Sequence, residues 1–132
     1  DTYSITFSED ERLDKKTAID GVFRYTPDFV VGKSFRISRE LTDVGAIILD
    51  GVKSQEVTLT SSSGPHGVKA TMGDMTTLTV WTCTPQRGQY VCVEPMVSFG
   101  DTERPLELKD MKETRSLRKG EKAVYVNAFS VF

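Results

Sequence analysis

Apolar and polar residues alternate along several short stretches of the chain. Tyr3, Ile5 and Phe7 are each followed by a polar residue, and the same period of two recurs at residues 57–60 and 124–127. This period is typical of a β-strand with one face buried. Further β-forming runs lie at residues 34–37, 46–49, 78–82, 90–93 and 97–99. The pattern therefore predicts a protein built mainly from strands.

Turn-forming residues separate these runs. Asp-Gly, Ser-Gly-Pro, Arg-Gly and Lys-Gly sequences occur at residues 20–21, 50–51, 61–65, 87–88 and 119–120. Short strands at close spacing indicate an antiparallel all-β sandwich or barrel. The helix candidate, residues 106–118, lacks regular helical spacing of its apolar residues, so we expect a turn or two there. Residues 1–132 fit a single β-sandwich domain.

Charge and hydropathy exclude several classes of partner. The chain carries 17 Lys and Arg against 19 Asp and Glu, a net charge of −2, which favours neither nucleic acid nor an anionic membrane. Its apolar runs are too short to span a membrane, and its first residues lack the pattern of a signal peptide. We expect a cytosolic protein with a neutral or small polar ligand. The charged residues at 8–12 and the basic residues at 109–122 are expected to face solvent.

Two β-forming runs flank the turn at residues 85–88 and suggest a hairpin. If Arg87 and Gly88 form its tip, Cys83 pairs with Cys92, and Trp81 pairs with Glu94. A cross-strand disulfide is then possible, whereas a cytosolic location favours two reduced thiols. A loop of three or five residues would change this register.

Glu94 is the candidate reactive group of this hairpin. In the expected register it shares one face of the sheet with Trp81 and Cys92, which would partly desolvate the carboxylate and suit it to general base catalysis. Pro95 lacks a backbone N–H and is expected to end the strand, which places Glu94 at a sheet margin. The alternative is an ordinary exposed charge at a strand end.

The hairpin also resembles a known family. Residues 78–82 and the run Cys92-Val-Glu-Pro-Met96 resemble the C-terminal signature of the aldose 1-epimerase (galactose mutarotase) family. Residues 117–121 are similar to the turn before the last strand of that family, with Lys119 where a proline is usual. Asp43 lies where the family has a ligand-binding aspartate, without the aromatic residue that usually follows it.

This resemblance implies a fold and a chemistry. Family members form a longer β-supersandwich and interconvert the anomers of aldoses such as galactose or glucose, without cofactor or metal. Glu94 matches the base that takes the proton from the anomeric hydroxyl, and Asp43 would bind sugar hydroxyls. Trp81 would line a sugar platform, the alternative being a place in the core.

One catalytic group of the family is not evident. Its acid histidine lies in the N-terminal half, and His66, the one histidine here, lies in a turn-forming segment where we expect an exposed loop. Either the chain is the C-terminal portion of a longer mutarotase-like protein, or it is a non-catalytic carbohydrate-binding or protein-interaction module. The first interpretation predicts little activity alone, and self-association or binding of an N-terminal partner fragment. We expect neither a zinc site nor a cysteine nucleophile.

Overall fold

The computed structural model describes residues 2–19, 22–38, 45–82, 90–97, 107–111 and 114–132. The strands of this part are β1 (Tyr3–Ile19), β2 (Val22–Ile37), β3 (Ile47–Asp50), β4 (Glu56–Ser61), β5 (Gly67–Thr71), β6 (Thr77–Trp81), β7 (Cys92–Met96) and β8 (Phe129–Val131). Their pairings are antiparallel. The predicted all-β class is confirmed. Where the chain is described, no helix has the length and apolar character needed to cross a membrane.

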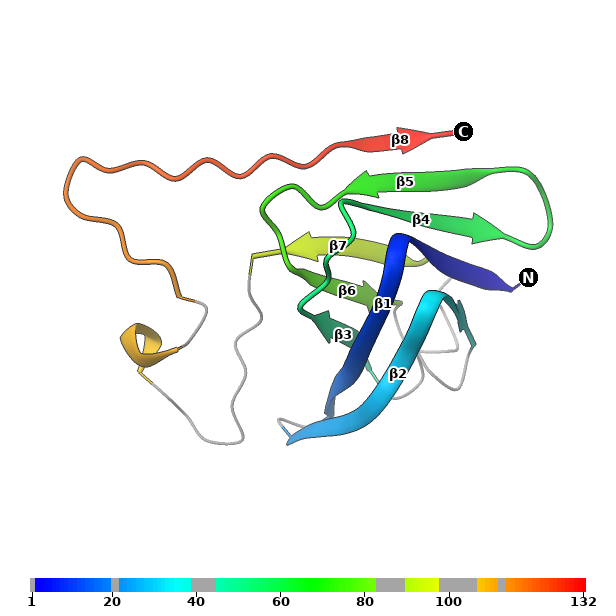
Figure 1. Cartoon of the computed structure of the whole chain (residues 1–132), viewed down its shortest axis with the longest axis horizontal. Coiled ribbons are helices and arrows are strands. Elements are labelled where there is room, and N and C mark those ends of the chain that lie inside the picture. Colours follow the sequence, from blue (N-terminus) through cyan, green and yellow to red (C-terminus); the bar gives the residue numbers. More distant parts are fainter. Residues whose placement is uncertain (1, 20–21, 39–44, 83–89, 98–106, 112–113) are drawn as a thin grey trace.

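The long strand β1 organises the sheet (Figure 1). Along one edge it pairs with β2, and its other edge is shared by two strands. Residues 3–7 pair with β4, whereas Lys15 and Lys16 pair with β3. The strand order is β7-β6-β3-β1-β4-β5-β8. Two groups of strands, β3-β6-β7 and β4-β5-β8, thus leave β1 at different points along its length, and the curled sheet folds over a common core.

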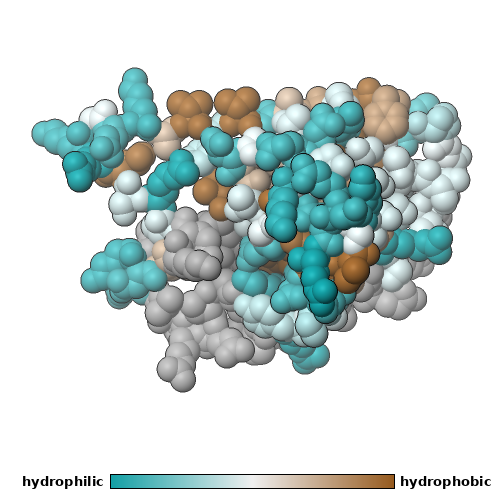
Figure 2. All heavy atoms as spheres, in the orientation of Figure 1, coloured by the Kyte–Doolittle hydropathy of each residue, from teal (hydrophilic) through white to brown (hydrophobic). Residues whose placement is uncertain are grey.

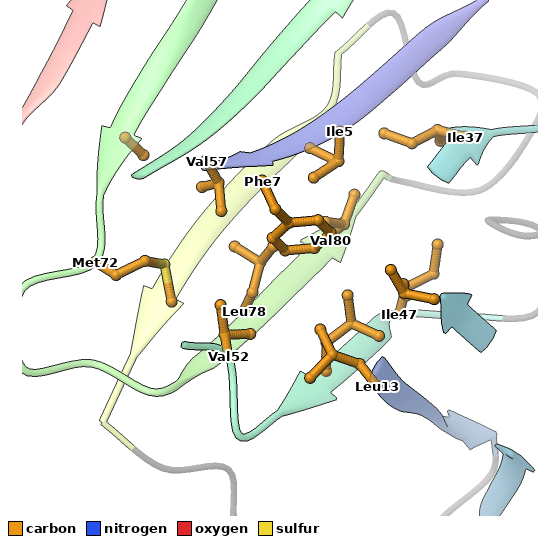
Figure 3. Packing of buried hydrophobic residues seen from close by; sticks show 13 residues of the cluster. Ile5, Phe7, Leu13, Ile37, Ile47, Val52, Val57, Met72, Leu78 and Val80 are labelled. Atoms are coloured by element: carbon orange, nitrogen blue, oxygen red, sulfur yellow. The ribbon is translucent and has the colours of Figure 1, made fainter. Parts of the chain in front are cut away.

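The core lies between these two groups of strands (Figure 3). Ile5 and Phe7 of β1 point toward Val57 of β4 and toward Leu78 and Val80 of β6. Other members of this buried cluster are Leu13, Val30, Ile37, Ile47, Leu49, Val52, Ala70 and Met72. Burial of this apolar surface stabilises the fold by about 25 cal/mol per Å². The apolar residues that the period-two pattern assigned to the buried face of β1 and β4 lie in or against this cluster, so that prediction is correct.

The charged segment at residues 8–12 lies within β1 and is exposed, as predicted, at every residue except Glu11. Glu11 is only 3% exposed and corrects the prediction at that position. The pairing of β1 with β2 shifts register between Thr6 and Glu11, which marks a bulge or irregularity. Glu11 nevertheless keeps the odd-numbered phase of the buried Ile5, Phe7 and Leu13, so the alternation of side chains along β1 directs it inward. Its Oε1 accepts hydrogen bonds from the backbone N–H groups of Lys53, at 3.0 Å, and Ser54, at 2.7 Å.

Strand boundaries also differ from the predicted ones. β5 was not predicted, and the strand expected at residues 124–127 lies instead at β8. The predicted short helix is a single 3-10 turn at Leu108–Asp110. Residues 98–99 of one predicted strand, and the ends of the helix candidate near 106 and 112–113, fall outside the described residues. The basic side chains described between residues 109 and 122 are exposed, as expected.

Candidate functional site: an aromatic and acidic face on strands β6 and β7

The β6–β7 pairing determines the neighbours of Glu94. Thr79 lies opposite Glu94, and Trp81 lies opposite Cys92. The predicted register, with Trp81 opposite Glu94 and Cys83 opposite Cys92, is therefore wrong by two residues, and Cys83 lies outside the described residues. The predicted register rested on an assumed loop length, and the period-two apolar pattern does not distinguish registers that differ by two residues. A shift of two residues leaves every side chain on its predicted face.

Trp81, Cys92 and Glu94 consequently share one face of the sheet, as predicted. It is the face opposite the core, since Leu78 and Val80 of β6 point into the core cluster. Tyr90 lies just before β7, and its ring centroid is 6.1 Å from that of Trp81. Trp81 is 37% exposed and Tyr90 50% exposed. We call Trp81, Tyr90 and Glu94 the aromatic–acidic face.

Glu94 itself is exposed, so the partial desolvation expected beside Trp81 and Cys92 is wrong. Glu94 was predicted at a sheet margin because its strand would end there, whereas it lies within β7, which stands at one end of the strand order of the described residues. Pro95 does not end the strand as predicted: it pairs with Leu78, and β7 continues to Met96. Proline is tolerated within an edge strand, where a backbone N–H is not needed on the solvent side.

The chemistry of this face suits a polyhydroxylated ligand. A carboxylate accepts hydrogen bonds from hydroxyl groups, and bonds to a charged acceptor are stronger than neutral ones. Exposed aromatic rings offer flat apolar surface with a polar group at the edge. Together, Glu94 and the pair of Trp81 and Tyr90 can bind a small ring that has both hydroxyl groups and apolar faces.

A second polar cluster lies on the same face, and sequence reasoning missed it. The Asp50 carboxylate accepts a hydrogen bond of 2.8 Å from Thr77 Oγ1 and forms an ion pair with Lys16 Nζ. Lys16 Nζ also lies 5.6 Å from the centre of the Tyr25 ring. Asp50 was interpreted only as a turn residue. Its alternation with the apolar Leu49 was the signal that could have placed it on this face.

Lys16 and Glu94 lie on strands that are three spacings apart, and the Lys16 ammonium is ion-paired with Asp50. The strand pairings form a row of Lys16, Ile48, Thr79 and Glu94 across the sheet. Adjacent strands lie about 4.7–4.9 Å apart, so three spacings separate the backbones of Lys16 and Glu94 by roughly 14 Å. Proton transfer needs contact within about 3 Å or through one water. The Lys16 ammonium is directed to the Asp50 carboxylate rather than to Glu94, so the structure gives no contact between Lys16 and Glu94.

The other sequence candidates lie elsewhere. His66 is exposed in the loop between β4 and β5, as predicted. It lines a groove of about 350 Å³ with Tyr3, Leu59, Val68 and Val131, on the strand group that does not carry Glu94. Asp43, the candidate sugar-binding aspartate, lies outside the described residues. Of the predicted site residues, the structure thus brings Trp81 and Glu94 onto one face.

Comparisons with known proteins agree with this fold. The structure is similar to that of a galactose mutarotase-like protein from Lactobacillus casei, with a TM-score of 0.76 and 20% sequence identity over 99% of this chain and 45% of that one. It is also similar to a galactose mutarotase related enzyme from Lactobacillus acidophilus, with a TM-score of 0.73 and 15% identity over 98% of this chain and 43% of that one. No protein-family model and no curated protein sequence matches the chain.

These similarities confirm the predicted fold, that of galactose mutarotase-like proteins. At 15–20% identity they concern the fold alone. The chain spans less than half the length of both solved structures.

Proposed function

We propose that the chain binds an aldose monosaccharide at the aromatic–acidic face and that Glu94 is the general base of anomer interconversion. The observation that carries this proposal is the exposure of Glu94 and Trp81 on one face of a mutarotase-like fold. The motif Cys92-Val-Glu-Pro-Met96, which resembles the mutarotase signature, supplies that carboxylate. A hexose such as galactose or glucose is the proposed ligand, with Asp43 as a further hydrogen-bonding group.

The proposed reaction consists of two coupled proton transfers. The Glu94 carboxylate takes the proton of the anomeric hydroxyl, and the electron pair left on that oxygen forms the aldehyde C=O as the bond from C1 to the ring oxygen breaks. The ring oxygen gains a proton from an acid. Rotation about the C1–C2 bond and the reverse steps then give the other anomer. Such proton transfers by positioned groups each contribute about 10²- to 10⁴-fold to a rate.

The acid is proposed to come from outside this chain. The backbones of Lys16 and Glu94 are roughly 14 Å apart, the Lys16 ammonium is ion-paired with Asp50, and His66 lies on the other group of strands. The solved structures of this fold are more than twice as long as the matched region. We therefore propose an N-terminal partner segment, covalently joined or separate, as the source of the acid. A cytosolic location is part of the same proposal.

A non-catalytic sugar-binding module is the second candidate function. It is favoured by the lack of a histidine or lysine near Glu94 in the described residues. In this case the aromatic–acidic face would bind the sugar without turnover. The two candidates share a binding site, so a binding experiment tests their common basis.

Trp81 makes that experiment direct. It is the one tryptophan of the chain, so its fluorescence reports on the proposed site alone. Titration with galactose and with glucose is expected to change the emission and to saturate. Glu94→Gln is expected to weaken binding by about five-fold, because hydrogen bonds to a charged acceptor exceed neutral ones by roughly 1 kcal/mol.

Glu9→Gln is the matched control, since Glu9 is also an exposed carboxylate on a strand but belongs to β1. Its sugar affinity is expected to equal that of the unmodified chain. An emission that does not respond to either sugar at high concentration would exclude the proposed site. Equal weakening by both substitutions would show that Glu94 has no specific role.

A further inference from the structure

β8 leaves one edge of the sheet open. Gly67 and Phe132 exchange backbone N–H to O hydrogen bonds of 3.0 and 3.2 Å, and Thr71 N donates to Ala128 O at 2.9 Å. In an antiparallel pair, alternate residues direct their backbone groups toward the partner strand. Residues 128, 130 and 132 therefore face β5, whereas Phe129 and Val131 direct their N–H and C=O groups away from it. Since β8 ends the strand order of the described residues, these groups form an open edge.

Exposed apolar side chains accompany this edge. The four largest between residues 126 and 132 are more than half exposed, at 52–81%: Val126, Phe129, Val131 and Phe132. Figure 2 shows hydrophobic side chains at several points along the rim where Figure 1 places the C-terminal segment and β8. Natural edge strands are commonly protected by charges, proline or bulges. Residues 123–132 contain neither a charged residue nor a proline.

We propose that β8 pairs antiparallel with β8 of a second copy of this chain and joins two sheets into one. Phe129 lies on the two-fold axis in this pairing, and its N–H and C=O bond to the same residue of the partner copy. Val131 then lies opposite Asn127, and Val126 opposite Phe132. Because the pairing is isologous, each of these side-chain contacts occurs twice, and the open backbone groups of both copies are paired.

Charge supports a second copy as the occupant of this edge. The paired region, residues 126–132, contains no charge that could repel its own copy. The basic residues Arg115, Arg118, Lys119 and Lys122 lie before it and remain outside the contact. Seven residues a side make an interface below the ~1,200 Å² of stable complexes. The dimer is therefore expected to form reversibly as protein concentration rises, and its strands do not include those that carry Trp81 and Glu94.

Sedimentation velocity on a dilution series tests the proposal. The average mass is expected to rise with concentration from 14.7 kDa toward twice that value. Val131→Lys is expected to keep the chain monomeric, since it adds a charge to an edge strand at a residue that is 81% exposed. Val124→Lys is the matched control: Val124 is 75% exposed but precedes the paired residues, and its variant is expected to dimerise normally.

Val131→Pro provides a second variant. It removes an outward N–H and leaves the hydrogen bonds of Phe132 to β5 in place. Circular dichroism equal to that of the unmodified chain would confirm that it folds, and loss of the dimer is expected. A chain that stays monomeric at every concentration would overturn the proposal. So would an association that both Val131 variants leave unchanged, because the contact would then lie elsewhere.

Discussion

At the scale of single residues, Glu11 is a buried polar side chain that joins the strand β1 to the loop after β3. Its Oε1 accepts two backbone hydrogen bonds from the loop after β3, and the carboxylate is buried. Glu11→Ala is expected to lower the free energy of unfolding by about 3 kcal/mol, because hydrogen bonds to a charged group contribute about 1.5–3 kcal/mol each. Urea denaturation followed by circular dichroism measures this change.

Glu9→Ala is the control for Glu11. The Glu9 side chain is exposed, and its backbone N–H, which donates to Ser54 Oγ at 3.1 Å, is unaffected by the substitution. Its effect should stay within about 0.5 kcal/mol, as for other surface changes. If both variants unfold at the same urea concentration, the two hydrogen bonds of Glu11 contribute no specific stability.

The chemistry of single residues was only partly predictable. The shared face of Trp81 and Glu94 could be predicted. Side chains alternate between the two faces of a strand, so an error of two residues in the register leaves each side chain on the same face. The exposure of Glu94 could not, since it depends on what lies over the sheet, which local sequence does not specify. The pairing of Asp50 with Lys16 joins residues far apart in sequence and gives no local signal. The role of Asp43 stays a prediction.

At the scale of elements, Gly73 allows the C-terminal segment to pack closely against the chain after β5. It has φ +55°, and a Cβ added there would lie 2.4 Å from the backbone oxygen of Val126. Gly73→Ala is therefore expected to displace the segment that leads into β8, in addition to the roughly 1–2 kcal/mol cost of positive φ. Hydrogen exchange at the Gly67 and Phe132 amides should become faster.

Gly51→Ala separates the two effects. Gly51 also has a positive φ, of +77°, but an added Cβ would meet nothing within 4 Å. This variant should lose a similar amount of overall stability without a selective increase of exchange at β8. Equal exchange at β8 in both variants would contradict a seating role for Gly73.

The elements were predictable where one face is clearly apolar. Ile5 with Phe7, and Val57 with Leu59, mark β1 and β4 correctly. β5 was missed although Val68 and Ala70 alternate with Lys69 and Thr71, because the run is short and alanine and glycine have low strand propensity. The length of β1 was underestimated, since charged residues at 8–12 conceal a strand that continues past a register shift. The hairpin register failed because it depended on an assumed loop length, and alignment of the apolar face with the core is the same for registers that differ by two residues.

At the scale of the whole molecule, strand periodicity and turn spacing predict the all-β class, but not the curl of the sheet. The curl arises because β1 pairs with β4 at one end and with β3 at the other. Contacts such as Tyr3 with Ser61 join distant parts of the chain and leave no pattern in a single sequence. The resemblance of the Cys92–Met96 motif to mutarotases predicted the fold that the structural comparisons confirm.

Catalysis is proposed to need more than this chain, because the proposed general acid comes from another segment. We expect freshly dissolved α-galactose or α-glucose to mutarotate no faster with this chain than in buffer. A base without its acid loses one of two proton transfers, worth about 10²- to 10⁴-fold. Polarimetry at several protein concentrations measures the rate. A rate that rises with the concentration of the chain, and falls in Glu94→Gln, would place a complete site within it.

The central claim is that the aromatic–acidic face binds an aldose, and NMR of the ¹⁵N-labelled chain tests it most directly. On titration with galactose or glucose, the account predicts saturable shifts of the Trp81 indole N–H and of the Trp81, Tyr90 and Glu94 amides. Amides around the separate groove of His66 should stay unchanged, which makes them an internal reference. Unchanged Trp81 and Glu94 signals at saturating sugar, or shifts confined to the His66 groove, would contradict the account.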